Sequence, residues 1–177
     1  MTVIVALKEN GVVYMGGDSA GTSEHRISVR KDAKVKKIGN ILIGFSGSFR
    51  AGQIISRDFK CPTRGKKQSL QAFMSTTFIN SFLDSLADND YIPPHDNTGV
   101  DILIAIEGKI FSILSDCQIE EVYSHYNAIG SGADSALGAL YATNKLGIPP
   151  ITRVKLCLSA SAQFCNQVRR PFHIIHS

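Results

Sequence analysis

The first eighteen residues constrain the fold of this 177-residue chain more than any other stretch. Two apolar runs rich in β-branched residues flank an Asn10-Gly11 step, which is the strongest short-range signal for a β-hairpin. With a two-residue turn at this step, the numbers of facing residues sum to 21. Thr2 is then expected opposite Ser19, with Asp18 one residue away across the ladder. The hairpin therefore brings a carboxylate to the start of the chain.

Thr2 carries the first candidate chemistry. If Met1 is removed, Thr2 offers a hydroxyl nucleophile and a free α-amine on one residue. The pKa of such an amine is about 7.7–8.0, so it can take up a proton near neutral pH. Thr2 is small enough for ordinary methionine aminopeptidases to remove Met1, and no longer propeptide is expected. A Met-Thr start has little weight alone, because most proteins that begin this way make no chemical use of the threonine.

A second hairpin is predicted by two apolar runs on either side of a Gly-Asn step at residues 39–40. Its facing residues sum to 79, which sets Lys34 against Phe45 and leaves Gly47 just beyond the pair. The backbone N–H of a glycine can approach a ligand closely because no Cβ intervenes. Taken alone, Lys34 would be a solvated lysine at a strand end that contributes little stability. Gly47 alone would be a turn glycine before a helix.

The rest of the chain alternates between groups of strands and groups of helices. Apolar periodicity predicts helices over residues 48–59, 70–86, 133–146 and 152–165, the last capped by Thr152. Strands are expected over residues 100–106, 109–114, 119–126 and, as an edge strand, 172–176; residues 19–32, with irregular strand, and 88–97 are expected as loops. This order excludes a βαβ parallel sheet and fits an α+β fold in a single domain over residues 1–177.

Composition narrows the class of protein. Hydrophobic residues make up 44% and charged residues 19%, which is ordinary for a soluble globular protein. The net charge is +4, and its densest cluster, residues 60–67, is better explained as a solvated loop than as a nucleic-acid patch. The four cysteines show no C-x-x-C spacing and the histidines do not complete a ligand set, so reduced thiols in a cytoplasmic protein and no metal site are expected. The sequence shows neither a leader peptide nor an 18-residue apolar run, so no membrane segment is expected.

Four motifs follow one another along the chain: Thr2 with Gly17-Asp18, the Lys34–Ile38 run, Gly44–Gly47 and Gly130-Ser131-Gly132. Together and in this order they resemble the N-terminal-nucleophile threonine peptidases, most closely the bacterial HslV type and more distantly the proteasome β subunits. The resemblance covers nearly the whole chain. It implies a four-layer αββα sandwich, with two antiparallel sheets stacked face to face between pairs of helices.

The resemblance also implies a role for each candidate residue. Thr2 Oγ would attack a peptide carbonyl while its amine shuttles the proton. Lys34 would lower the effective pKa of the nucleophile and of the amine, and Asp18 would hold the lysine ammonium in place. The Gly47 N–H would stabilise the oxyanion. Ser131 would support the Thr2 amine, although a serine before a helix is usually just an N-cap.

Two positions depart from the family pattern. Gln163 stands where these peptidases often carry an aspartate beside the site, so a monovalent-cation site there would lack a charge. No cofactor is expected to be required. Phe49 is bulky where a small residue is common near the substrate pocket, and together with Phe45 it indicates an altered or narrowed pocket.

The resemblance implies a cytoplasmic threonine endopeptidase that forms a homo-oligomeric ring or double ring and cleaves proteins and peptides. A separate ATP-dependent unfoldase would feed it, because this chain has no G-x-x-x-x-G-K-[ST] motif. Two alternatives stay open. One is a catalytically inactive ring subunit with a structural or regulatory role. The other is an N-terminal-nucleophile amidase that acts on a small molecule.

Overall fold

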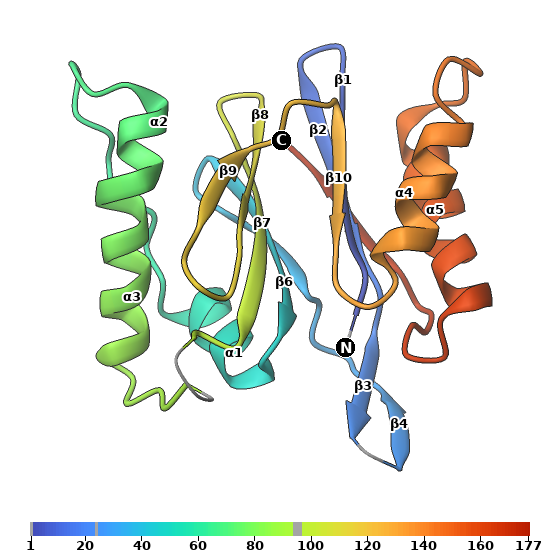
Figure 1. Cartoon of the computed structure of the whole chain (residues 1–177), viewed down its shortest axis with the longest axis horizontal. Helices are drawn as coiled ribbons and strands as arrows, with labels where there is room; N and C mark the ends of the chain where they lie inside the picture. Colours follow the sequence, from blue (N-terminus) through green and yellow to red (C-terminus); the bar gives the residue numbers. More distant parts are fainter. Residues whose placement is uncertain (1, 24, 94–96) are drawn as a thin grey trace.

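The computed structural model describes residues 2–23, 25–93 and 97–177, whose strands form two main antiparallel sheets and one separate hairpin (Figure 1). The first sheet has the order β10-β1-β2-β11, with bounds Tyr126–Ile129, Ile4–Glu9, Val12–Gly17 and His173–His176. The second has the order β5-β6-β7-β8-β9, with bounds Val35–Ile38, Ile41–Gly47, Val100–Ile106, Lys109–Ile113 and Ile119–Glu121. The separate hairpin consists of β3 and β4, with bounds Ala20–Ser23 and Arg26–Val29.

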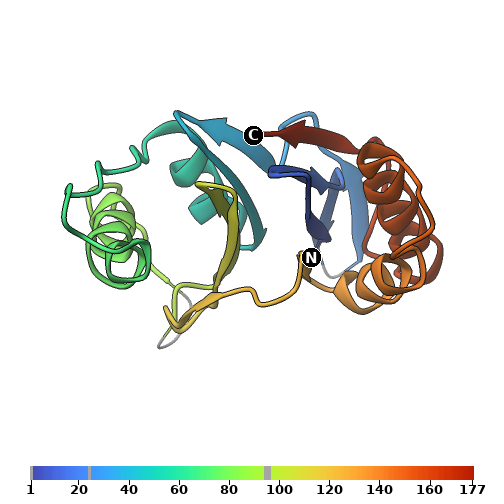
Figure 2. The same cartoon turned by 90° about the horizontal axis from the view of Figure 1, so that it is seen from above.

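Helices cover the outer face of each sheet. The four-stranded sheet is covered by α4 (Ala133–Ala142) and α5 (Pro150–Phe164). The five-stranded sheet is covered by α1 (Phe49–Arg57) and by a long helix made of α2 (Leu70–Phe73), the π-helical turn η1 (Met74–Phe78) and α3 (Ile79–Ala87). From above, the order helix, sheet, sheet, helix is visible across the molecule (Figure 2). The four-layer α+β sandwich is therefore confirmed.

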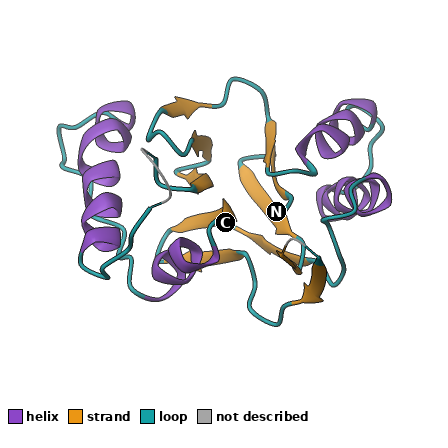
Figure 3. Ribbon diagram, turned by 60° about the horizontal axis from the view of Figure 1, so that its bottom comes forward, coloured by secondary structure: helices purple, strands orange, loops and turns teal. Residues whose placement is uncertain are grey.

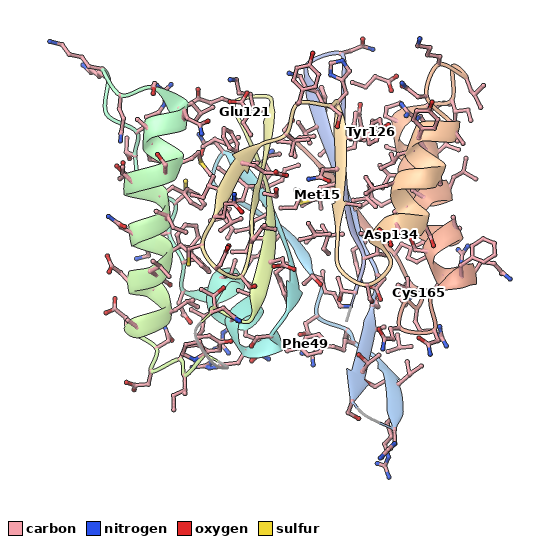
Figure 4. The ribbon with its side chains drawn as sticks, in the orientation of Figure 1. Met15, Phe49, Glu121, Tyr126, Asp134 and Cys165 are labelled. Atoms are coloured by element: carbon pink, nitrogen blue, oxygen red, sulfur yellow. The ribbon has the colours of Figure 1, made fainter. Side chains whose placement is uncertain are left out.

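Both faces of the central strands are buried, which explains their continuous apolar sequences. In β1 and just before it, Val3, Val5 and Leu7 face α4 and α5, whereas Ile4 and Ala6 face the other sheet. The core between the sheets also contains Met15, which Figure 4 places between them. A strand with two buried faces has no polar side to alternate with, so its sequence reads as one apolar run.

The two hairpins predicted with a register form as expected, since Ile4 faces Gly17 in the first and Val35 faces Gly44 in the second. The strands expected over residues 100–106 and 109–114 form a third hairpin, in which Ile106 faces Lys109. A two-residue turn sets the register of the strands that follow it, and the turn residues were readable from the sequence. The edge strand near the C-terminus is confirmed as β11, which pairs with β2.

The ladder of the first hairpin ends earlier than predicted. The backbone N–H of Asp18 still donates to Val3 O at 3.3 Å. Beyond this point the backbone N–H of Ser19 donates to Arg169 O at 2.9 Å. The expected Thr2–Ser19 pairing was therefore wrong, because the segment after α5 supplies the partner that Ser19 uses.

Several boundaries also differ from the prediction. The single strand expected over residues 119–126 is two strands, since β9 pairs with β8 whereas β10 crosses to the other sheet and pairs with β1. Helix α5 begins at Pro150 after an extended Pro149, so Thr152 does not cap it, and α4 ends at Ala142. The predicted loop over residues 19–32 contains β3 and β4, which project from the end of the sandwich (Figure 1).

Gly52 on α1 allows close packing between this helix and the five-stranded sheet. A Cβ at position 52 would overlap the ring of Phe45, a buried residue of β6. Gly138 on α4 offers a contrast, because a Cβ there would meet no atom within 4 Å. Both glycines are helical, so their replacement by alanine changes helix propensity in the same direction.

We predict that Gly52→Ala lowers the free energy of unfolding by about 1–3 kcal/mol, because the added methyl group overpacks the contact with Phe45. Gly138→Ala is the matched control and is expected to be neutral or to stabilise by up to about 1 kcal/mol. Denaturant unfolding of both variants measures the difference. Equal stabilities would contradict the packing of Phe45 on Gly52.

Candidate active site

Three side chains meet where the two sheets approach each other at one end of the sandwich. The Lys34 ammonium donates hydrogen bonds to Thr2 Oγ1 and, at 2.8 Å, to Asp18 Oδ1. The side chain of Lys34 is 1% exposed, and Thr2 and Asp18 are 2% and 0% exposed as residues. Seen from the end of the sandwich, the N-terminus lies among the strands with the helices outside (Figure 3). The hydroxyl, the ammonium and the carboxylate therefore form one buried hydrogen-bonded chain.

Two glycines let the sheets come close enough for this contact. A Cβ on Gly17 would lie 3.1 Å from Val35 Cγ1 of the five-stranded sheet, and a Cβ on Gly44 would lie 2.5 Å from Ile4 Cγ2 of the four-stranded sheet. Thr2 and Asp18 flank strands of the four-stranded sheet, whereas Lys34 directly precedes β5 of the other sheet. The glycines thus permit an approach of the sheets that sets Lys34 against a hydroxyl and a carboxylate from the opposite side.

The Asp18 carboxylate accepts hydrogen bonds from three backbone N–H groups. Oδ1 accepts from the Val3 N–H at 3.1 Å, and Oδ2 accepts from the N–H groups of Ala20 at 2.8 Å and Arg169 at 3.2 Å. Together with the Lys34 ammonium, these donors satisfy both oxygens of a fully buried carboxylate. Asp18 is therefore a fixed negative charge that orients Lys34 toward Thr2.

Burial lowers the pKa of Lys34 from its ordinary value of 10.5, because a low-dielectric surrounding disfavours the charged ammonium. The negative charge of Asp18 opposes this effect, and the positive charge of Arg30 adds to it. A lysine of lowered pKa beside a hydroxyl is typical of a functional site, since such a cation can stabilise a developing alkoxide.

Ser131 contacts the backbone of Thr2. The Thr2 N–H donates to Ser131 Oγ at 3.3 Å, and Ser131 Oγ donates to Thr2 O at 3.4 Å. The residue at the N-cap of α4 is Gly132, so the Ser131 side chain is not used as a helix cap. Gly130 has a positive φ of 92°, and a Cβ there would overlap Thr2 O, so this loop needs glycine to lie against Thr2.

Gly47 lies at the junction between β6 and α1. Its φ is 106°, and a Cβ at this position would overlap Gly99 O, so no other residue fits without strain. The next residue, Ser48, caps α1 by accepting a hydrogen bond from the Ala51 N–H at 3.2 Å. The preceding residue, Ser46, packs against the Gly130 loop that carries Ser131. Gly47 is therefore one residue away from the contact between Ser46 and the loop that carries Ser131.

Phe49 stands beside the cluster on the first turn of α1 (Figure 4). The centre of its ring is 5.7 Å from the Lys34 nitrogen and 4.2 Å from the Arg30 guanidinium carbon. The Arg30 Nε also donates to Asp32 Oδ1 at 3.1 Å, and this pairing lowers the pKa of Asp32. An aromatic ring with two cations nearby stabilises their charges and narrows the space next to Lys34.

Several contacts of the cluster had no signal in the sequence. Arg169 reaches Asp18 through its backbone N–H, which any residue type except proline provides. The Cys165 thiol lies 3.7 Å from Ser131 Oγ, across 34 residues of sequence. Gln163, in the place where an aspartate was expected, is exposed on α5 and lines a surface pocket with Arg169. Thus Cys165, rather than Gln163, makes the contact with the described cluster.

Residues 2–163 match the family model described as "Proteasome subunit". This chain belongs to the proteasome subunit family. That assignment confirms the resemblance inferred from the sequence motifs, and a comparison with curated proteins finds no match. The match begins at Thr2 and includes Asp18, Lys34 and Ser131.

Solved structures share the fold at low sequence identity. Thiobacillus denitrificans BPH in complex with epoxomicin superposes with a TM-score of 0.83 and 19% identity, over 99% of this chain and 97% of that one. HslV from Trypanosoma brucei gives 0.70 and 14%, over 98% of each chain. Anbu from Yersinia bercovieri gives 0.68 and 16%, over 98% of this chain and 80% of that one. BPH therefore superposes better than this HslV does.

Two other classes of site, a metal centre and a membrane-spanning helix, are absent from the described part of the chain. Among residues 2–23, 25–93 and 97–177, no three His, Cys, Asp or Glu residues are grouped so that they could hold a metal ion. None of the helices in these ranges has the length and apolar character needed to span a bilayer.

We predict that Lys34→Ala lowers the free energy of unfolding by about 3–5 kcal/mol, because it leaves a buried carboxylate without its counterion. From the sequence, Lys34 was expected to contribute little stability as a strand-end lysine, and its burial predicts a larger contribution. Lys37→Ala, on the exposed side of β5, is the control and should change stability by less than about 0.5 kcal/mol. Denaturant unfolding separates the two, and equal stabilities would contradict the structural importance of the ion pair.

Proposed function

We propose that this chain is a threonine-type endopeptidase that hydrolyses peptide bonds with Thr2 after removal of Met1. The observation that carries the proposal is the buried Lys34 ammonium, which contacts both Thr2 Oγ1 and Asp18 Oδ1. A stability role alone would need only the Lys34–Asp18 pair. The added contact with a hydroxyl at the second residue supports a catalytic role.

The first half of the reaction forms an ester. Thr2 Oγ attacks the carbonyl carbon of the scissile bond, and its proton passes to the free α-amine of the same residue. The Lys34 ammonium stabilises the developing alkoxide, and Asp18 keeps that ammonium in place. The Gly47 N–H donates to the oxyanion of the tetrahedral intermediate. When the C–N bond breaks, the leaving amine takes the proton from the α-ammonium.

The second half of the reaction releases the acyl product. The α-amine takes a proton from water, which attacks the ester carbonyl, and Thr2 Oγ leaves with the proton returned to it. Ser131 supports this cycle because its hydroxyl contacts both the nitrogen and the carbonyl oxygen of Thr2. It thereby restricts the rotation of the residue whose amine must reach water and Oγ in turn.

Membership of the proteasome subunit family supports a ring or double ring of identical subunits whose sites face inward. A separate ATP-dependent unfoldase and a cytoplasmic location are part of this proposal. The inactive ring subunit differs from it in the state of Thr2, since it requires no free amine. The small-molecule amidase differs in substrate, since it would not cleave an unfolded protein such as casein.

We predict that the active protein begins at Thr2. While Met1 is attached, the Thr2 nitrogen is a peptide amide without basicity, so the proton shuttle has no base. Thr2→Ala should abolish hydrolysis of casein and of peptides, and Thr2→Ser should retain part of it because serine keeps both the hydroxyl and the amine. Intact-mass measurement on active material gives the first residue.

Two controls make this test decisive. A peptide epoxyketone offers one carbon to a hydroxyl and another to an adjacent amine, so it should add its mass to the wild type but not to Thr2→Ala. Activity in a chain that fully retains Met1 would exclude the threonine mechanism. Retained Met1 with no activity would favour the inactive subunit, and cleavage of small amides without casein would favour the amidase.

We predict a bell-shaped dependence of kcat/KM on pH. Activity should rise as the α-amine loses its proton, below its ordinary pKa of about 7.7–8.0 because the nearby Lys34 ammonium disfavours a second positive charge. It should fall as Lys34 loses its charge, and burial places that alkaline limb below pH 10.5. Initial rates on a neutral peptide, with circular dichroism to verify folding at each pH, measure both limbs. Activity that stays constant up to pH 10.5 would remove the Lys34 charge from the mechanism.

A further inference from the structure

A cavity of about 310 Å³ adjoins the segment that leads to Lys34. Its wall includes Asp32 and Ala33, the two residues that precede Lys34 in the chain. It also includes Phe45, whose backbone N–H donates to Lys34 O at 3.1 Å. The cavity therefore adjoins the segment whose Lys34 ammonium contacts Thr2 Oγ1.

The aromatic part of the cavity wall comes from Phe45. The ring of Phe45 packs directly on Gly52 of α1, and both residues line the cavity. Phe49, one turn earlier on the same helix, places its ring near Lys34 and Arg30. The ring of Phe45, from β6, thus forms part of the cavity wall. Phe49 is not among the described lining residues, so a pocket narrowed by both rings stays a prediction.

The charge of the cavity is positive. Arg30 is paired with Asp32, the one carboxylate among the described lining residues. Arg57 also lines the cavity, and no residue in the described ranges pairs with its guanidinium. Lys36 adds a second cation nearby, because its ammonium donates to the carbonyl of the lining residue Ser56.

We infer that Arg57 is a specificity-determining residue, and that this cavity selects substrates with an acidic side chain, glutamate or aspartate, on the acyl side of the scissile bond. The inference rests on the proposed peptidase function. The cavity offers a carboxylate a guanidinium donor that lacks a described protein partner. Gln53 and Ser56 add polar groups at the wall, whereas the apolar floor is already occupied by Phe45.

Three peptides that differ only in the residue before a fluorogenic leaving group test the inference: one with glutamate, one with glutamine and one with leucine. Glutamine has nearly the same shape as glutamate without the charge, so this pair isolates the electrostatic contribution. We expect kcat/KM for the glutamate peptide to exceed that for the glutamine peptide by about tenfold or more, as for a hydrogen bond to a charged group.

Arg57→Gln should remove that preference by lowering kcat/KM for the glutamate peptide about tenfold, with the leucine peptide changed less than about twofold. Arg50→Gln is the matched control, because Arg50 lies on the same helix but donates to Asn89 O at 3.3 Å, away from the cavity. This control should keep the glutamate preference. Equal rates for all three peptides, or a glutamate preference that survives Arg57→Gln, would overturn the inference while the peptidase function stands.

Binding measurements separate this inference from the proposed function. In the Thr2→Ala variant the cavity residues are unchanged, so calorimetry with peptide amides ending in glutamate or glutamine reports selection without turnover. Tighter binding of the glutamate peptide, lost on adding Arg57→Gln, would support the inference even if no peptide is cleaved by the parent protein. Equal binding of the two peptides would overturn it.

Discussion

The buried ion pair between Lys34 and Asp18 is the interaction on which the rest of the site depends. It joins the end of the four-stranded sheet to the start of the five-stranded sheet, at 2.8 Å and with both side chains excluded from solvent. Two charges buried in this way are tolerated only when their remaining hydrogen-bonding groups are satisfied. Three backbone N–H groups do this for Asp18, and Thr2 Oγ1 accepts from Lys34.

This arrangement makes the position of the Thr2 hydroxyl a consequence of how the sheets pack. Gly17 and Gly44 allow the sheets to approach, and the Gly130 loop closes over Thr2 O. A larger residue at any of these positions would push apart the elements that hold Thr2 and Lys34 together. The chemistry proposed for Thr2 therefore depends on the core between the sheets as well as on the groups in contact with it.

The surroundings of Lys34 connect the proposed catalysis with the proposed substrate selectivity. Arg30 lowers the pKa of Lys34 through its charge, stacks on Phe49 and pairs with Asp32 at the cavity wall. One arginine thus affects both the charge beside Thr2 and the wall of the adjacent cavity. Arg57, the lining cation with no pairing partner among the described residues, comes from α1 in the layer outside the five-stranded sheet.

Local sequence predicted the parts of the site that hairpins control. The turns at Asn10-Gly11 and Gly39-Asn40 determine strand register, and register brings Asp18 back beside Val3 and places Lys34 at the strand end. Glycine-rich steps likewise marked Gly47 and the loop before α4. These predictions succeeded because the interactions that determine them lie within a few residues along the chain.

The sequence by itself determined the fold class, the hairpin registers and the residue types available at Thr2, Asp18 and Lys34. Only the tertiary structure decided that Lys34 is buried rather than solvated, that residues 119–129 divide between two sheets, and that Arg169 supports Asp18 through its backbone. Burial depends on which distant surfaces pack together. Every residue except proline offers the same backbone N–H, so residue type does not show which one will be used. Such contacts therefore leave no local pattern in the sequence.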